Sequence, residues 1–305
     1  MPADPWLVLA AAGLEGAAGY PRRLHAIVPH PVAWIGAELG FLERQLNRGG
    51  DLRRRLAGCA TISLVAGAAA LAGHLLDGLG WPVLIVVAGA AGLAARSLHD
   101  HVAAVEKALA LDLPGARSAV GMIVGRDVAE LDERGVAAAA LESLAESFND
   151  GVVAPLFWFL IGGLAGLFAY KAVNTADSMI GHREEPYRCF GWAAARLDDL
   201  MNLVPARLSG LLICLVAGRG WRVMLRDAGK HASPNSGWPE AAMAGALGVS
   251  LGGPAAYDGV PHLRPRFGEG PRPTRLDLRR GVGLYLRACA ALAVALAMGG
   301  LAWPR

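Results

Sequence analysis

The uncharged run from Val152 to Ala169 is the feature that most constrains the fold. It is followed at once by the polar stretch YKAVNTADSMIGH, Tyr170 to His182, without a loop between them. A helix needs about 20 predominantly apolar residues to cross the hydrocarbon core of a bilayer. Since backbone groups in lipid must be satisfied internally, only helices and closed barrels span membranes. The run therefore predicts a membrane-embedded helix that leads directly into a polar segment.

The composition agrees with a membrane protein. Hydrophobic residues make up 54% of the 305 and charged residues only 18%, and the mean hydropathy of +0.38 is rare for a soluble domain. The apolar stretches of near-membrane length are 6–19, 56–76, 81–98, 152–169 and 282–303, with a shorter one at 203–218. We expect an all-α integral membrane protein with about four to six membrane-embedded helices, some of them broken or re-entrant.

Several classes of function are disfavoured. The net charge of +3 is small and the basic residues form no tract with interleaved aromatics, so we expect no nucleic-acid partner. The four cysteines lie far apart without a CxxC pair, which argues against zinc or redox chemistry. The first five residues lack the basic n-region of a signal peptide, so the first helix is expected to be retained.

The polar segments differ in character. Residues 99–150 are Ala-rich with helical spacing and an expected break at Leu113–Gly115, whereas 219–280 reads as a long cytoplasmic loop with short helices. Seven arginines between residues 21 and 55 favour a cytoplasmic position for that segment. We expect one membrane-embedded catalytic domain over 1–305, multi-pass in a bacterial inner membrane, with its site facing the cytoplasm. Residues 77–81 predict a tight helical hairpin.

Ionisable residues interrupt some apolar stretches. Arg207 and Arg287 lie near the ends of theirs, so we expect their side chains to snorkel to the interface. Glu15 lies inside the first stretch, where a carboxylate is costly unless it lines a site.

The first acidic cluster precedes the long apolar run. Glu142 and Glu146 are four residues apart on a helix, and Asn149 and Asp150 follow one turn later on the same face. In a soluble protein this pattern is usually a solvated helix face. Here it runs into the membrane, where carboxylates need a bound cation or an arginine partner, and oxygen ligands of this kind suit Mg²⁺.

Two further clusters have the same chemistry. Asp198 and Asp199 lie four and three residues before Asn202, and Asn174 lies three residues before Asp177. Helical spacing groups each set on one face. These sets predict a metal or phosphate platform at a membrane edge, with an N-cap or loop pair as the ordinary alternative for Asp198 and Asp199.

The clusters pose a geometric problem. A straight helix over 152–169 would bring Asp150 and Asp177 out on opposite faces of the membrane. Pro155 and the glycines between 162 and 166 allow the run to be broken, and irregular backbone is tolerated at depth when it is buried in protein. We favour a broken run whose two ends serve one site.

Two glycine-containing motifs carry weaker signals. GMIVGRD, residues 121–127, lacks the GxxxxGK[ST] pattern of a P-loop; Arg126 is a candidate phosphate contact, with local pairing to Asp127 or Glu130 as the alternative. The turn at 233–237 leads into a helix beginning near Pro239, and such a helix N-terminus is a natural anion site.

Five segments carry a resemblance to a known family. They are PHPVAWIG, ARSAVGMIVGRDVAELDERGVAAAALESLAESFNDGVVAPLFWFLIGG, AYKAVNTADSMIGH, FGWAAARLDDLMNLVPARLS and SPNSGWPEAAMAGALGVSLGGPAAYDG. Taken in order, they resemble the CbiB/CobD family of membrane-bound adenosylcobinamide-phosphate synthases. The sequence departs from the family pattern at Ser147, where an Asn is usual, and at Glu15, where an Asp is frequent.

The resemblance implies ATP-dependent amide formation between adenosylcobyric acid and (R)-1-amino-2-propanol O-phosphate, with Mg²⁺ as cofactor. A carboxylate must be activated before an amine attacks it, and phosphoryl transfer from ATP is the expected route, by inference from the chemistry. The expected partners are the corrinoid, the aminopropanol phosphate, the lipid bilayer and other late enzymes of cobalamin synthesis.

On this hypothesis the polar residues receive roles. The metal set is Glu142, Glu146, Asp198, Asp199 and Asn202; the catalytic set is Lys171, Asn174, Asp177 and Asp150; the substrate-binding set is His30, Arg126, Ser178, Arg196, Ser233 and Asn235. Asn174 and Asp177 would orient the phosphate or accept the amine proton, and His30 or Glu15 would contact the corrinoid.

Two other classes fit parts of the pattern. A membrane prenyltransferase or alcohol phosphotransferase would also place acidic clusters around Mg-diphosphate at a bilayer edge, but the chain lacks paired DxxxD-type motifs. A membrane sensor resembling AmpE, or a transporter, is the non-enzymatic alternative.

Overall fold

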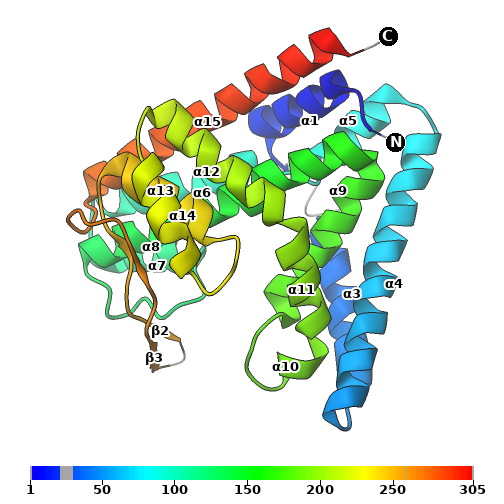
Figure 1. Cartoon of the computed structure of the whole chain (residues 1–305), viewed down its shortest axis with the longest axis horizontal. Helices are drawn as coiled ribbons and strands as arrows, with labels where there is room; N and C mark the ends of the chain where they lie inside the picture. The colour runs from blue at the N-terminus through cyan, green and yellow to red at the C-terminus, as the bar shows by residue number, and fades with distance from the viewer. Residues whose placement is uncertain (1, 21–29, 258, 304–305) are drawn as a thin grey trace. The chain divides into compact units, whose positions relative to one another are not determined.

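The computed structural model describes residues 2–20, 30–257 and 259–303 (Figure 1). The α-helices are α1 (Pro5–Ala18), α3 (Pro31–Leu46), α4 (Asp51–Gly78), α5 (Pro82–Ala90), α6 (Ala95–Ala108), α7 (Leu113–Gly121), α8 (Glu133–Phe148), α9 (Ala154–Ile180), α10 (Tyr187–Phe190), α11 (Trp192–Met201), α12 (Leu203–Ala217), α13 (Trp221–Asp227), α14 (Gly237–Leu247) and α15 (Arg275–Ala302). A π-helix, Asn149–Val153, joins α8 to α9, and a 3-10 turn, Ala228–Lys230, follows α13.

Four of the described helical segments are long and apolar enough to cross a membrane. They are Asp51–Gly78, Pro82–Ala108, Glu133–Ile180 and Arg275–Ala302, and α11 with α12 makes a fifth if that bent pair is one span. Helix α1 is apolar but shorter. The prediction of an all-α, multi-pass membrane protein is confirmed.

The chain divides into two compact units. The first unit comprises Met1–Ala94, Ala154–Asn202 and Leu296–Arg305, and the second comprises Ala95–Val153 and Leu203–Ala295. Each unit therefore combines segments that are distant in the sequence.

Proline and aspartate fix several helix starts. The predicted turn at 77–81 is present, since α4 ends at Gly78 and α5 begins at Pro82. The expected break at Leu113–Gly115 is instead the first turn of α7: Asp112 caps it by accepting a hydrogen bond of 2.6 Å from the Gly115 N–H. Proline is tolerated here because its missing N–H would be unsatisfied at this position in any case.

The segment predicted as a cytoplasmic loop contains short strands as well as helices. Strand β1 (Leu251–Gly252) pairs antiparallel with β4 (Arg266–Phe267), and β2 (Ala255–Tyr257) pairs with β3 (Val260–His262). The strands are two or three residues long, too short for an alternating pattern in the sequence to reveal them.

Helix α9 is broken at Gly163. This residue has φ 62° and ψ −156°, a conformation that is essentially restricted to glycine. The Leu164 N–H just beyond the break donates to the Asp77 carboxylate of α4 at 2.9 Å. Figure 1 shows α9 turning at this bend and then continuing toward its C-terminal end. The prediction of a broken run is confirmed, while the return of both ends to one membrane face stays a prediction.

Glycines bring the backbones at the break into contact. A Cβ on Gly73 of α4 would clash with the Leu164 carbonyl, and one on Gly166 would clash with the Trp158 carbonyl across the bend. Helices α4 and α9 therefore pack backbone to backbone in the first unit.

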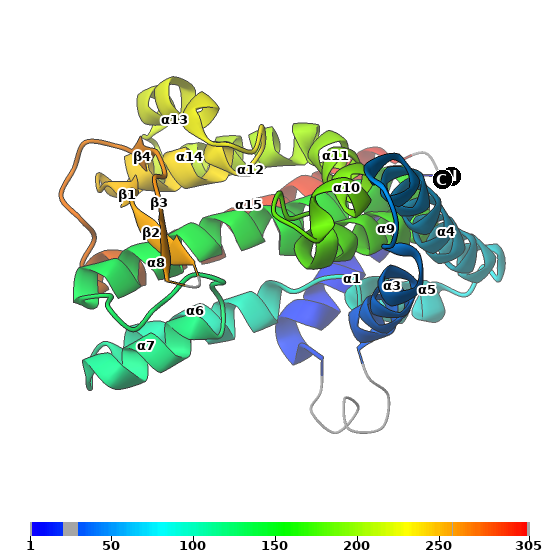
Figure 2. The same cartoon turned by 90° about the horizontal axis from the view of Figure 1, so that it is seen from below.

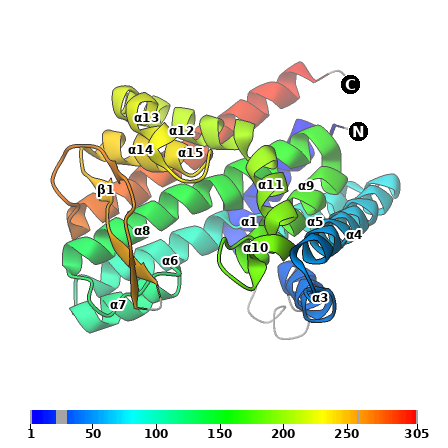
Figure 3. The ribbon, with the colours of Figure 1, turned by 60° about the horizontal axis from the view of Figure 1, so that its bottom comes forward.

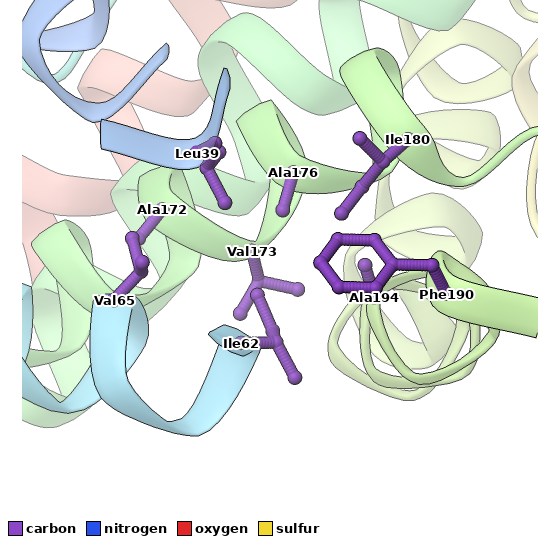
Figure 4. Close-up of a cluster of buried hydrophobic side chains, with 9 residues drawn as sticks. All are labelled: Leu39, Ile62, Val65, Ala172, Val173, Ala176, Ile180, Phe190 and Ala194. Atoms are coloured by element: carbon purple, nitrogen blue, oxygen red, sulfur yellow. The ribbon is translucent and has the colours of Figure 1, made fainter. Parts of the chain in front are cut away.

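An apolar cluster below the break completes this packing (Figure 4). Its buried members are Leu39 of α3, Ile62 and Val65 of α4, Ala172, Val173, Ala176 and Ile180 of α9, Phe190 of α10 and Ala194 of α11. Two of the four members from α9 are alanines, which allow its neighbours to approach closely. The cluster fixes residues 164–180 against α3, α4 and α11.

Helix α8 is the centre of the second unit. Its residues 135–142 are all buried, as expected where residues 135–141 are apolar around the whole circumference, and Glu142 is the charged exception. Figure 2 shows α8 between α6 and α7 on one side and α14 on the other. The strand-bearing segment crosses α8 (Figure 3), and the Gly252 N–H donates to the Glu142 side chain at 2.8 Å.

The break predicts a difference between two adjacent glycines. We expect Gly163→Ala to lower the stability by about 1–3 kcal/mol, because alanine is strained at this backbone conformation. Gly162→Ala is the matched control: a Cβ there meets no atom within 4 Å, so we expect no loss and a gain of up to about 1 kcal/mol. Thermal unfolding in detergent measures both. Equal effects would show that the break is not needed for stability.

A second pair of glycines tests the packing of α4. We expect Gly73→Ala to cost about 1–3 kcal/mol through overpacking against Leu164. Gly67→Ala on the same helix enters open space and should be neutral or slightly stabilising. Unfolding midpoints of the two variants in one detergent give the comparison; a Gly73→Ala variant as stable as Gly67→Ala would contradict the close approach.

Candidate functional site

A polar cluster in the first unit joins α9 to α11. The Asp198 carboxylate accepts hydrogen bonds from the amide of Asn174 at 3.3 Å and from that of Asn202 at 3.0 Å. The Tyr170 hydroxyl donates to Asn202 Oδ1 at 3.1 Å. Asp177 lies close enough for its charge to act on Asp198. Helical spacing explains the convergence, since 170, 174 and 177 share one face of α9, and Asn202, the C-cap of α11, lies one turn after Asp198.

This first cluster has the chemistry of a Mg²⁺ site. Two neighbouring carboxylates repel each other in a partly buried position, and a divalent cation would relieve that repulsion. Carboxylate and amide oxygens are the hard donors that Mg²⁺ prefers. Over the described ranges, no three His, Cys, Asp or Glu side chains already form a complete ligand group. Water and substrate phosphates usually complete a Mg²⁺ shell, so the residues present fit such an ion.

Neighbours of this cluster differ in their environment. Asp199 forms an ion pair of 3.1 Å with Arg196, whose side chain is half exposed. The Ser178 hydroxyl donates to the Asn174 carbonyl at 2.9 Å, within α9. Asp199, Arg196 and Ser178 thus lie on the same helices as the cluster, and their predicted roles stay predictions.

Lys171 lines a cavity of about 480 Å³ in the first unit. The other charged residue in its wall is Glu38 of α3, and the rest of the lining is apolar, including Trp34 and Phe168. His30 is the N-cap residue of α3: its Nδ1 accepts a hydrogen bond from the Val32 N–H at 3.3 Å. Glu15 is buried on α1. These positions offer an apolar recess with one ammonium and one carboxylate.

A second charged cluster lies in the second unit around Glu142. One carboxylate oxygen of this buried residue pairs with Arg126 and with Arg264 Nη1, the latter at 3.0 Å, and the other oxygen accepts from the Gly252 N–H. The sequence allowed either a cation or an arginine as partner for Glu142, and the structure provides two arginines. The alternative of a local pairing of Arg126 with Asp127 or Glu130 is not the pairing observed, because the folded chain presents Glu142 to Arg126 instead. Asp127 accepts from the Gly259 N–H at 2.8 Å.

Glu240 is the most strongly perturbed group of this second cluster. It is 1% exposed on α14, 3.7 Å from Arg264 Nη2 and 3.6 Å from His231 Nε2. Burial, followed by the charges of Glu142 and Glu146, raises the pKa of Glu240 well above its ordinary value. Burial also lowers the pKa of His231. Glu240 is therefore a carboxyl group that favours its neutral form.

Other predicted residues lie in the second unit. Glu146 accepts from the Ser236 hydroxyl at 3.1 Å. The Ser233 hydroxyl accepts from the Asn235 N–H at 3.2 Å, so it stabilises its own turn. Asn235 is buried and its Oδ1 accepts from Arg207 at 3.3 Å. Arg207 also lies over the Trp238 ring at 4.8 Å, so its side chain packs on the protein, while its predicted snorkelling to the interface stays a prediction.

The π-helix holds the last predicted pair. The Asn149 amide donates to Asp150 at 2.7 Å, and Asn149 Oδ1 accepts from the Ser209 hydroxyl at 3.0 Å. Asp150 belongs to the second unit and Asp177 to the first, so their meeting in one site stays a prediction.

Three residues of the second cluster were missed by the sequence reasoning: Glu240, His231 and Arg264. Glu240 is the one charged residue in the helix GWPEAAMAGAL, and this isolation in an apolar helix is the signal that could have identified a buried acid. Arg264 and His231 lie in loops without a pattern, and only the folded chain places them beside Glu240.

Comparisons with known proteins define the class. The family model described as CobD/Cbib protein matches residues 8–285. Cobalamin biosynthesis protein CobD from Rhodobacter capsulatus is 50% identical over 97% of this chain and 98% of its own length. Proteins of the same name from a Sinorhizobium species and from Geobacter metallireducens are 48% and 47% identical over 94% and 95% of this chain, and over 95% of their own lengths. No solved structure matches.

The chain belongs to the CobD/Cbib family, whose members are named for cobalamin biosynthesis. The resemblance inferred from the sequence is confirmed, and it holds over nearly the whole chain.

Glu240 predicts a stability that depends on pH. Between the ordinary pKa of 4.5 and the raised value, the unfolded chain is ionised at this residue while the folded chain keeps the proton. The folded state therefore loses stability as the pH rises through this window, by about 1.4 kcal/mol per pH unit. Arg264 and Arg126 lower the pKa of this carboxyl and so moderate the effect, and His231 faces it at 3.6 Å.

Glu240→Gln removes this titration. We expect the stability of the variant relative to the wild type to increase from about pH 5 to about pH 8, as measured by thermal unfolding in detergent. Glu184→Gln, the same change in an exposed loop, is the control and should parallel the wild type. A difference between Glu240→Gln and the wild type that is constant over this range would contradict a raised pKa.

Proposed function

We propose that this protein is the ATP-dependent ligase that joins adenosylcobyric acid to (R)-1-amino-2-propanol O-phosphate, giving adenosylcobinamide phosphate. The observation that carries the proposal is the family match over residues 8–285, within which the polar cluster of Asn174, Asp177, Asp198 and Asn202 lies. The reaction needs groups that hold phosphates through a cation and a group that removes a proton from the amine. The cluster supplies both kinds of group.

Asp198 is the proposed Mg²⁺ ligand. Its carboxylate is oriented by the amides of Asn174 and Asn202, and Tyr170 in turn holds Asn202. Such outer contacts orient a metal ligand and tune its affinity. When bound, Mg²⁺ would neutralise phosphate oxygens of ATP during phosphoryl transfer to the propionate.

Asp177 is the proposed proton acceptor. The substrate amine is an ammonium ion at neutral pH and attacks a carbonyl carbon only after it loses a proton. Asp177 follows Asn174 by one turn on α9 and lies close to Asp198 of α11. The amine would therefore be deprotonated close to the bound phosphates.

Lys171 and the apolar cavity are proposed to receive the corrinoid. The cavity of about 480 Å³ would hold only part of so large a molecule, and its lining suits the apolar edge of a macrocycle. The Lys171 ammonium in its wall would attract a propionate carboxylate. His30 caps the helix that contributes Trp34 and Glu38 to the same wall.

The second cluster is proposed to support the fold rather than to transfer groups. Arg126 and Arg264 are both paired with Glu142, so a phosphate would have to displace a buried carboxylate to reach them. Through Glu142, the two arginines connect the loop around residue 126 and the segment around residue 264 to α8. This assignment removes Glu142 from the metal set and Arg126 from the substrate-binding set that were proposed from the sequence.

The activity assay uses the full chain in nanodiscs with adenosylcobyric acid, aminopropanol phosphate, ATP and Mg²⁺. We expect adenosylcobinamide phosphate to form only when all four are present, as detected by mass spectrometry. Asp198→Asn and Asp177→Asn should each lose about 100-fold or more in rate, the range typical for positioned acid–base and metal-binding groups. Glu184→Gln is the matched control and should retain the wild-type rate.

The Mg²⁺ dependence separates the two roles. Excess Mg²⁺ should restore part of the rate of Asp198→Asn, because that variant binds the ion about 10–100-fold more weakly. The same excess should not restore Asp177→Asn, which lacks the proton acceptor. Absence of product from the wild type would reject the reaction. Full activity of both variants would reject the site.

A further inference from the structure

A hollow of about 590 Å³ in the second unit is lined by three arginines and by none of the acidic residues that the structure describes. Arg219 follows α12, and Arg280 and Arg287 lie on α15; Ala217, Ala246, Leu247, Gly283 and Leu284 complete the lining. Figure 3 shows α12, α14 and α15, the helices around it. Neither the polar cluster of the first unit nor the Glu142 cluster contributes to this hollow.

The arginines are arranged to receive one anion. Arg280, Gly283, Leu284 and Arg287 recur at the spacing of one face of α15. The two arginines of that face are about 10 Å apart along the helix axis. A Cβ on Gly283 between them would meet nothing within 4 Å, so the space over this turn is open.

Much of this positive charge is unused. The Arg219 Nε donates to the Ala246 carbonyl at 2.7 Å, which fixes the side chain without neutralising it. Arg280 pairs at 3.0 Å with Asp277 on the turn before it. Arg287 makes no hydrogen bond or ion pair with any residue in the described part of the chain. Three guanidinium groups therefore share one carboxylate.

The position along α15 indicates the membrane interface. Helix α15 is a candidate span, and its 15 residues after Arg287 carry no charge. They cover about 22 Å, somewhat less than the hydrocarbon core of about 30 Å. A snorkelling Arg287 would thus place its guanidinium at the level of the lipid phosphates, with Arg280 just outside it.

We propose that this hollow binds the phosphate of an anionic phospholipid headgroup. Guanidinium groups bind phosphate oxygens in a bidentate manner, and basic pockets between helices at the membrane edge are suited to anionic lipids. The apolar part of the lining, Leu247, Leu284 and the two alanines, suits the start of the acyl chains. The apolar lining favours a lipid over a free phosphate ion.

Lipid binding is measured with the full chain in detergent, using fluorescent phosphatidylglycerol and competition by unlabelled phosphatidylglycerol, phosphatidylcholine or inorganic phosphate. We expect competition by phosphatidylglycerol alone. Arg287→Gln and Arg280→Gln should each weaken binding about fivefold, the effect of one basic residue near an anionic surface. Arg287→Lys keeps the charge but loses the bidentate geometry, so it should fall between Arg287→Gln and the wild type.

Arg279→Gln is the matched control. Arg279 is an exposed neighbour on α15 that is not part of the lining of the hollow, so its loss should leave the affinity unchanged. Thermal unfolding without lipid confirms that each variant is folded. If Arg287→Gln does not fold, Arg280→Gln tests the hollow independently. Equal competition by phosphatidylcholine, or an equal loss in Arg279→Gln, would overturn the proposal. Competition by inorganic phosphate with the same arginine dependence would also overturn it and would assign the hollow to a soluble phosphate.

Discussion

The hydrogen bond from the Leu164 N–H to Asp77 is the interaction on which the first unit depends. Breaking a helix inside an apolar run exposes backbone groups that have no water to bond, and each such group is costly if it stays unsatisfied. Asp77 satisfies one of them from α4, and Gly73 one turn earlier allows the two backbones to touch. The bend then directs the polar face of residues 164–180 toward α11.

The polar cluster is a consequence of that direction. Once residues 164–180 are fixed by the apolar cluster of Figure 4, Asn174 and Asp177 can reach the side chain of Asp198. The same helix faces α3 and α4 with small residues and presents Lys171 to the apolar cavity. One broken helix thus positions an oxygen-rich cluster and an apolar recess in the same unit.

The buried carboxyl groups of the second unit are stabilised in a different way. Glu142 is compensated by two arginines and a backbone N–H, an arrangement that offsets the cost of removing its charge from water. Glu240 shares Arg264 with Glu142 and has one carboxylate oxygen without a hydrogen bond among the described residues. Its neutral, protonated form is therefore favoured. Glu142 and Glu240 therefore differ in the partners that compensate their burial.

The sequence by itself determined the apolar helices, the membrane class, the family and the grouping of polar residues within each helix, because helical spacing is a local property. Asn174 with Asp177, and Asp198 with Asn202, could be paired from it. Only the tertiary structure decided that the run breaks at Gly163 and not at a neighbouring glycine, because the acceptor Asp77 lies 87 residues away. It also decided that Glu142 meets Arg264, 122 residues distant, and that Glu240 is buried beside both. Partners so far apart in the chain leave no local pattern to read.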